Sequence, residues 1–136
     1  MATHQATIIW RRGDANFSDQ KYSRAHDWHF DGGAVIPASS SPAVVPLPFS
    51  RAENVDPEEA FIAALSSCHC LFFLSEAATA GFVVDLYEDR ASGNMGKIDG
   101  KIAIRTVHLH PHTVFMGQQP TAADLRQWHE AAHEQC

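Results

Sequence analysis

The chain has 136 residues, a formal net charge of −6 and only ten lysines and arginines. This length predicts a single domain, residues 1–136, with a buried core, and the negative charge argues against nucleic acid or an anionic membrane as a partner. The first residues carry no leader pattern, and three cysteines do not make a disulfide framework. A cytoplasmic protein with free or redox-active thiols is therefore expected.

The first part of the chain predicts three short strands followed by a loop. β-rich runs cover residues 5–12 and 22–30, and the turn signal Asp31-Gly32-Gly33 predicts a hairpin whose return strand covers residues 34–37. The proline-rich segment that follows, residues 38–55, predicts an extended surface loop.

The segment from Asp56 to Phe82 predicts one long helix. Asp56 is a suitable N-cap, Glu59 completes a capping box with it, and Gly81 supplies a C-terminal stop. Apolar residues cover nearly the whole circumference, which predicts a buried central helix rather than an amphipathic one. The apolar run is too interrupted for a membrane span, because three polar residues fall inside it: Ser66, Ser67 and His69.

The last part of the chain predicts two strands and a second helix. The strands cover residues 82–90 and 101–110, the second with a phase slip at Arg105-Thr106, and residues 91–100 are expected to form a loop between them. Thr121 is expected to cap a helix over residues 122–135. This order predicts an α+β fold in which an antiparallel sheet wraps around the central helix.

Cys68 is the first candidate for chemistry, in the middle of the long helix. One interpretation is that it is a small apolar filler, because free cysteine is often buried. A reactive Cys68 would need a cation to hold its thiolate, since the helix N-terminus is too far away. Arg51 and Arg24 are the available cations. Cys70 lies roughly 200° further around the helix, so the two cannot form a disulfide or share a metal ion.

Histidines give the second candidate, a zinc site. His129-Glu130-Ala131-Ala132-His133 matches the HExxH pattern, in which two histidines bind zinc and the glutamate acts as general base. We rank this zinc-hydrolase interpretation low, because Trp128 and Ala132 are needed for packing. A second group, His108, His110 and His112, is more typical of exposed residues at a strand end.

Two segments together resemble the OsmC/Ohr family of thiol-dependent hydroperoxide reductases. DPEEAFIAALSSC is similar to the family's signature helix, and AHEQC is similar to its A-H-x-x-C placing of a second cysteine. Phe115 and Gly117 match the F-x-G loop before that helix, and YSRAHDWHFDGG resembles one branch of the family.

The resemblance implies an enzyme that reduces organic hydroperoxides without a cofactor or a metal. Cys68 would attack the peroxide, Cys136 would resolve the sulfenic acid as an intramolecular disulfide, and an external dithiol would reduce it. Glu58 would orient the arginine that stabilises the thiolate. Arg51 fits the OsmC branch and Arg24 the Ohr branch, with Arg51 preferred. Apolar access is expected from the proline-rich loop and from three helix residues: Leu71, Phe72 and Phe73.

The resemblance also implies an intertwined homodimer. Glu58 and Cys68 are ten residues apart, roughly 15 Å along a straight helix, so one arginine cannot easily reach both within one chain. A site built where two central helices cross would bring Glu58 of one chain near Cys68 of the other. Family members continue after the second cysteine with a final strand that these 136 residues lack. A non-catalytic OsmC-like protein that binds a small ligand is the alternative.

Overall fold

The computed structural model describes all 136 residues and divides into two compact units, Met1–Ala60 and Phe61–Cys136. Its elements are β1 (Ala6–Ile9), β2 (His26–Phe30), β3 (Val35–Ala38), α1 (Pro57–Thr79), β4 (Val83–Asp89), β5 (Ser92–Ile98), β6 (Lys101–His108), β7 (Pro111–Met116) and α2 (Ala122–Gln135). All strand pairs are antiparallel, so the predicted α+β class is confirmed. That the chain is a single domain stays a prediction.

The unit of residues 1–60 is a three-stranded sheet with a long loop. The strand order is β1-β2-β3, and the predicted hairpin forms, with the Gly33 amide donating to the Phe30 carbonyl oxygen at 3.0 Å. Pro37 lies in β3, which is an edge strand where a missing N–H is tolerated. Buried Ser39 ties the loop to this sheet, because its Oγ accepts from the Arg51 amide at 2.9 Å.

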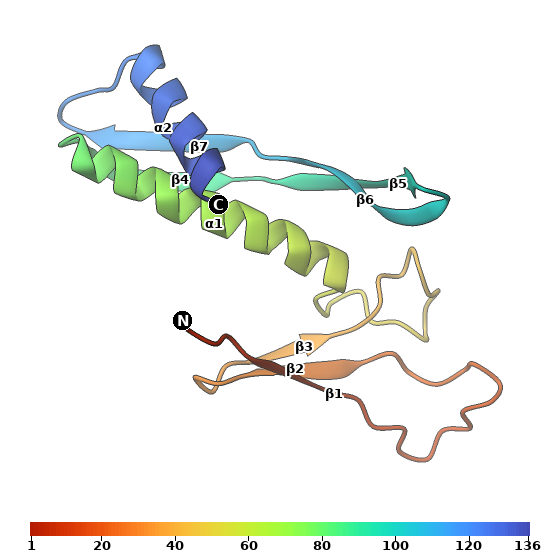
Figure 1. Ribbon diagram of the computed structural model, residues 1–136. Coiled ribbons are helices and arrows are strands. Elements are labelled where there is room, and N and C mark those ends of the chain that lie inside the picture. The colour runs from red at the N-terminus through yellow and green to blue at the C-terminus, as the bar shows by residue number, and fades with distance from the viewer. The chain divides into compact units, whose positions relative to one another are not determined.

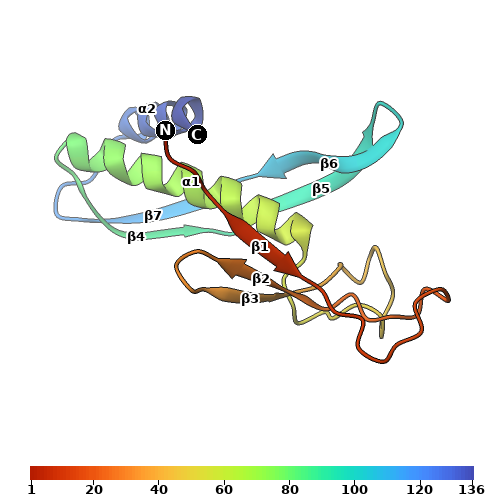
Figure 2. The same ribbon diagram turned by 60° about the horizontal axis from the view of Figure 1, so that its bottom comes forward.

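The unit of residues 61–136 holds most of α1, two strand pairs and α2. Figure 1 shows β4 leading into β5, and β6 into β7, so that the pairs β4–β7 and β5–β6 follow each other along one long twisted ribbon. Both views show α1 beside this ribbon (Figures 1 and 2). The core of the unit joins α1, β7 and α2 through five buried residues: Phe73, Ala77, Phe115, Trp128 and Ala132.

Both helices begin and end where the sequence predicts. At α1, Asp56 Oδ1 accepts from the Glu59 amide at 2.8 Å and Glu59 Oε1 accepts from the Asp56 amide at 3.2 Å, which completes the capping box. The helix stops at Gly81, with φ 86°, and the Phe82 amide donates to the Ala77 carbonyl oxygen at 3.0 Å, as in a Schellman motif. At α2, Thr121 forms the predicted cap with a capping box of its own.

Two strands contradict the sequence prediction. Residues 91–100 do not form a loop, because Ser92–Ile98 is strand β5 and pairs with β6 through a tight turn at Asp99 and Gly100, both at positive φ. The turn is the D-G hairpin signal that the prediction passed over. Residues 111–116, to which the sequence assigned no strand, form β7, so Phe115 of the F-x-G match lies in a strand. The phase slip at Arg105-Thr106 is real and is a bulge, since Asn94 pairs with Thr106 but Met95 pairs with Ile104.

Helix α1 is buried along one face only within a single chain. Its buried residues are His69, Phe73 and Ala77, whereas Phe61 and Leu71 are 49% and 65% exposed. By length and composition the helix could cross a membrane. The prediction that its polar residues exclude a membrane span is therefore wrong. The helix packs against Trp128 and Phe115 as a core helix does, and core helices can be as long and as apolar as membrane spans.

Candidate functional site

Two thiols meet between the two helices of the second unit. Cys68 lies in the middle of α1, and Cys136 is the C-cap of α2, where its amide donates to the Ala132 carbonyl oxygen at 3.1 Å. The neighbouring Cys68 raises the pKa of the Cys136 thiol, first through a hydrogen bond between the two side chains and then, after a contribution from burial, through its charge. Cys136 is therefore biased toward its protonated form beside Cys68. All three cysteines are free thiols.

Cys70 does not belong to this pair. Burial and the charge of Asp89 raise the pKa of the Cys70 thiol, and the nearby Cys70 and Asp89 contribute, after burial, to a Tyr87 pKa of about 12. Cys70 thus lies toward β4, where Tyr87 and Asp89 are found, as expected for a residue roughly 200° around the helix from Cys68. Its high pKa makes it a poor nucleophile at neutral pH.

A hydrogen-bonded histidine pair lies beside the thiols. His69, next to Cys68 in α1, has its Nε2 2.9 Å from Nδ1 of His129 in α2, and the two rings are nearly parallel with centroids 5.2 Å apart. The ring of Phe73 stacks on His129 at 4.4 Å. Burial lowers the pKa of both histidines, and the charge of Asp89 opposes this shift at each. The pair is therefore biased toward the neutral state, in which one nitrogen donates and the other accepts.

Asp89, at the end of β4, joins helix α1 to the turn between β6 and β7. Its Oδ2 accepts from Ser66 Oγ of α1 and its Oδ1 from the His110 amide, both at 2.6 Å. The carboxylate therefore connects α1 with the turn between β6 and β7. Hydrogen bonds to a carboxylate are stronger than those between neutral groups, so this contact holds the ribbon against the helix.

A cavity of about 280 Å³ opens next to Cys136. Three of its lining residues are apolar and three can take part in proton or thiol chemistry: Leu65, Val107, Leu109, His69, His133 and Cys136. Small apolar cavities with a few polar groups are typical of small-molecule sites. Cys136 itself reaches this cavity, so a ligand there would lie against one of the two thiols.

The expected apolar approach is different from the one observed. Phe73 is fully buried in the core and Phe72 packs partly against it, so neither lines the cavity, and Leu71 is exposed. The lining residues Leu65 and His133 were missed, although each lies three positions before a candidate cysteine and so shares a helix face with it. Val107 and Leu109 could not be assigned to this cavity from the sequence, because the twist of the β-ribbon decides which of its side chains face the helices.

Glu58 has an unusual environment at the start of α1. Its Oε2 is buried and has no hydrogen-bond partner. Burial raises the pKa of nearby Asp56, but hydrogen bonds with Glu59 and Glu58 lower it overall, and the Asp56 contact raises the pKa of Glu59. A buried carboxylate oxygen without a donor is costly, so Oε2 of Glu58 is an acceptor that lacks a donor within one chain, although the Glu58 side chain contacts Asp56.

Neither candidate arginine is bonded to Glu58 within residues 1–60. Arg51 Nη1 lies 3.6 Å from Glu53 Oε1, and both side chains are more than half exposed, so the pair contributes about 1 kcal/mol at most. Arg24 Nη1 donates to the carbonyl oxygens of Gln20 at 2.8 Å and Tyr22 at 2.6 Å, and Arg24 Cζ lies 3.8 Å from the centroid of the Tyr22 ring.

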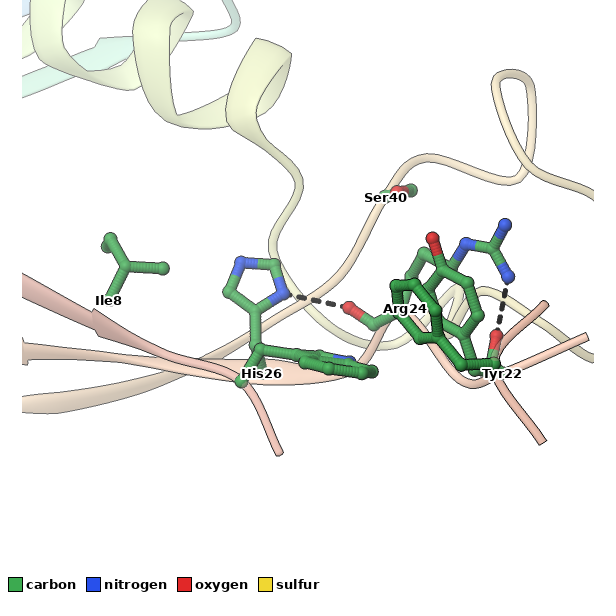
Figure 3. Close-up of a pocket in the computed structure, with 7 residues that line it drawn as sticks. Ile8, Tyr22, Arg24, His26 and Ser40 are labelled. Atoms are coloured by element: carbon green, nitrogen blue, oxygen red, sulfur yellow. Dashed lines mark hydrogen bonds between the residues drawn. The ribbon is translucent and has the colours of Figure 1, made fainter. Parts of the chain in front are cut away.

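Arg24 also lines an open aromatic pocket of about 380 Å³ in the first unit (Figure 3). The other lining residues are Ile8, Trp10, Phe17, Tyr22, His26 and Ser40. The guanidinium is held by local carbonyl groups rather than by a carboxylate. Arg51, by contrast, is held at its backbone by Ser39, and its side chain has only the exposed partner Glu53, which another carboxylate could replace.

The HExxH interpretation has no ligand set. His129 uses Nδ1 in the bond to His69, and no group of three or more histidine, cysteine, aspartate or glutamate side chains is arranged to hold a metal ion. Trp128 and Ala132 are buried, as the packing argument required. His108 and His110 stack with ring centroids 6.4 Å apart but form no such group either.

Solved structures give the family. The chain is 52% identical to an OsmC-like protein of unknown function from Vibrio cholerae O1 biovar eltor, over 100% of this chain and 90% of that one, with a TM-score of 0.98. The chain belongs to the OsmC-like family. No family model matches the sequence, and no curated protein matches it.

More distant structures share the OsmC-like fold. An organic hydroperoxide resistance protein from Elizabethkingia anophelis is 19% identical, with a TM-score of 0.72 over 100% of this chain and 84% of that one. That of Bacillus subtilis is 20% identical, with a TM-score of 0.66 over 99% of this chain and 86% of that one. At these identities the likeness concerns the fold alone.

Proposed function

We propose that this OsmC-like protein is a thiol-dependent peroxidase that reduces organic hydroperoxides to alcohols. The observation that carries the proposal is the meeting of Cys68 and Cys136, from two different helices, beside an apolar cavity. Two neighbouring thiols, one that attacks and one that resolves, are sufficient for a peroxide-reducing cysteine cycle that passes through an intramolecular disulfide.

The first step forms a sulfenic acid. The Cys68 thiolate attacks one peroxide oxygen, so that an S–O bond forms, the O–O bond breaks and the departing alkoxide takes a proton to become the alcohol. A guanidinium would hold the thiolate and donate to the departing oxygen. Arg51 is the preferred cation, because its side chain has only an exposed partner, and Arg24 is the alternative.

The second step closes the cycle. Cys136 attacks the sulfenic sulfur of Cys68, so that an S–S bond forms and the hydroxyl leaves as water with the Cys136 proton. An external dithiol then reduces the disulfide by exchange. The apolar walls formed by Leu65, Val107 and Leu109 favour an organic hydroperoxide over hydrogen peroxide as substrate. The role would be antioxidant, in the stress response of the cytoplasm.

A homodimer is part of this proposal. Glu58 Oε2 is buried without a donor, and Glu58 lies roughly 15 Å along the helix from Cys68. A second chain would supply the missing contacts if the two α1 helices cross, placing Glu58 of one protomer and its arginine near Cys68 of the other. The apolar residues Phe61 and Leu71, exposed in one chain, would then be covered. A monomer in sedimentation at micromolar concentration would contradict this arrangement.

The test is turnover of tert-butyl hydroperoxide and of hydrogen peroxide with a dithiol reductant. Cys68→Ser should abolish turnover, and Cys136→Ser, mixed with peroxide in the absence of the dithiol, should complete one round and stop with a sulfenic acid on Cys68. Cys70→Ser is the matched control from the same helix and should behave as wild type. Wild-type protein that turns over neither peroxide, with a Cys68 slow to alkylate in the folded state, would refute the proposal and favour a ligand-binding role.

A further inference from the structure

The contact between Cys68 and Cys136 depends on how α1 and α2 are rotated about their axes. The core between the helices consists of Phe73 and Ala77 from α1 with Trp128 and Ala132 from α2. Apolar packing of this kind is non-directional, so it brings the helices together without fixing their rotation closely. Cys136 is exposed, so packing does not hold its side chain in place.

The buried histidine pair is the directional contact at this point. His69 directly follows Cys68, and its Nε2 lies 2.9 Å from Nδ1 of His129. On α2, His129, His133 and Cys136 are spaced by four and three residues and so share one helix face. His69 of α1 and both His133 and Cys136 of α2 line the same cavity, so one ring of the pair and one of the thiols face the same space between the helices.

We propose that the His69–His129 hydrogen bond positions Cys136 against Cys68. The bond fixes the rotation of α2 two turns before Cys136 and the rotation of α1 one residue after Cys68. A second polar contact between the helices, from Gln135 Nε2 to Glu76 Oε1 at 2.9 Å, is exposed and therefore weaker. His69 also lines the cavity, but His129 does not, so the role of the His129 ring is to position the thiols.

Charge state separates this role from simple packing. The bond needs one nitrogen that accepts, so it is lost when both rings are protonated. The groups that face the pair are Asp89 from β4 and His133 from α2, with Arg126, Glu130 and Glu134 around the surface depression that His129 and His133 line. Asp89 favours protonation and His133 opposes it, and burial lowers the pKa of both rings, so thiol pairing should weaken only at a pH below the ordinary histidine pKa.

The measurement is the equilibrium of the thiol pair with glutathione, in the full-length protein and without peroxide. Cys68 and Cys136 give up two protons and two electrons to form the S–S bond, and one glutathione disulfide becomes two glutathione thiols. The Cys68–Cys136 disulfide is quantified by peptide mass spectrometry, which separates it from any bond to Cys70. The equilibrium constant reports how closely the fold holds the two sulfurs together.

Three variants test the histidine pair. His129→Leu removes the hydrogen bond at similar volume and should lower the equilibrium constant about threefold to tenfold at pH 7.5. His129→Asn keeps an amide near the position of Nδ1, so it should stay within about twofold of wild type and lose the decline at acidic pH. His112→Leu, a change of an exposed histidine on β7, is the matched control and should have no effect.

The positioning role serves the proposed peroxidase cycle and so rests on the proposed function, but the outcomes below separate the two. An unchanged equilibrium constant in His129→Leu would overturn the positioning role. An equal decrease of the equilibrium constant in His129→Leu and His129→Asn would also overturn it, because it would indicate that the ring acts through packing alone. Pairing that depends on His129 in a protein without peroxide turnover would uphold the inference and refute the peroxidase. Circular dichroism of each variant, at pH 7.5 and at the acidic pH where pairing declines, excludes global unfolding as the cause of a lower equilibrium constant.

Discussion

Forming the Cys68–Cys136 disulfide should stabilise the folded protein strongly. The two thiols are neighbours in the reduced chain, because Cys68 raises the pKa of the Cys136 thiol. The two cysteines enclose about 70 residues, nearly the whole second unit. In the chain-entropy account, a loop of that length lowers the entropy of the unfolded state by the equivalent of about 4 kcal/mol.

The assay is thermal unfolding of the oxidised and the reduced protein at the same concentration and pH. For a chain of this size, about 4 kcal/mol corresponds to a rise in Tm of about 10 °C or more. Cys68→Ser and Cys136→Ser should each abolish the difference between the two conditions. Cys70→Ser should preserve it, because Cys70 lies toward Tyr87 and Asp89.

Two results would refute the reasoning. An oxidised protein no more stable than the reduced one would mean that the native fold holds the sulfurs in a geometry that strains the bond. A disulfide that joins Cys70, or that joins two chains, would mean that Cys136 does not lie against Cys68 in solution. The reduced form of each serine variant provides the baseline, since loss of one thiol should change its Tm little.

Three further predictions concern the core, the ribbon and the histidine pair. Phe73→Ala should destabilise the fold by about 3–5 kcal/mol in urea unfolding, because Phe73 is fully buried, and a loss under about 1 kcal/mol would contradict its place in the core. Gly93→Ala would put a Cβ 2.7 Å from Ile62 Cδ1 and should lower the free energy of unfolding by about 1–3 kcal/mol. Adding Ile62→Ala should recover most of the loss caused by the Gly93 change, whereas simple additivity of the two losses would count against a clash. Burial lowers the pKa of His69, so the unfolded chain binds more protons below about pH 6.5 and stability should fall as the pH drops from there; urea midpoints equally flat in wild type and His69→Gln would contradict this.

Local chemistry made the helices predictable from the sequence. The Asp56 and Thr121 caps and the Gly81 stop each depend on a few neighbouring residues, and all three form as expected. The strand β5 was missed because glycine, asparagine and lysine have low strand propensity, and its stability comes from pairing with β6. Its glycines have a packing role, since the position of a Cβ on Gly93 is already filled by Ile62.

The candidate site was only partly predictable, for a different reason. Cys68 and Cys136 were recognised from motifs, and the structure brings them together, although their roles stay a proposal. The His69–His129 bond joins residues 60 positions apart, and no local pattern indicates it. His129 instead attracted a metal interpretation, because a helical i, i+4 histidine spacing looks the same whether the rings bind zinc or one of them bonds to another helix.

The features that one chain leaves incomplete lie along α1. At its start, Glu58 has a buried oxygen with no donor, and further along, Phe61 and Leu71 expose apolar surface. A buried acceptor without a donor and an exposed apolar helix face are each unfavourable in water, and the same event, a second α1 crossing the first, would relieve both. The crossing would also bring an arginine-bearing loop to a thiol that lies beyond the reach of Glu58 in its own chain. In the proposed dimer, assembly and thiol activation would be one problem, because the contact that would bury the apolar face of α1 would also supply the cation to Cys68.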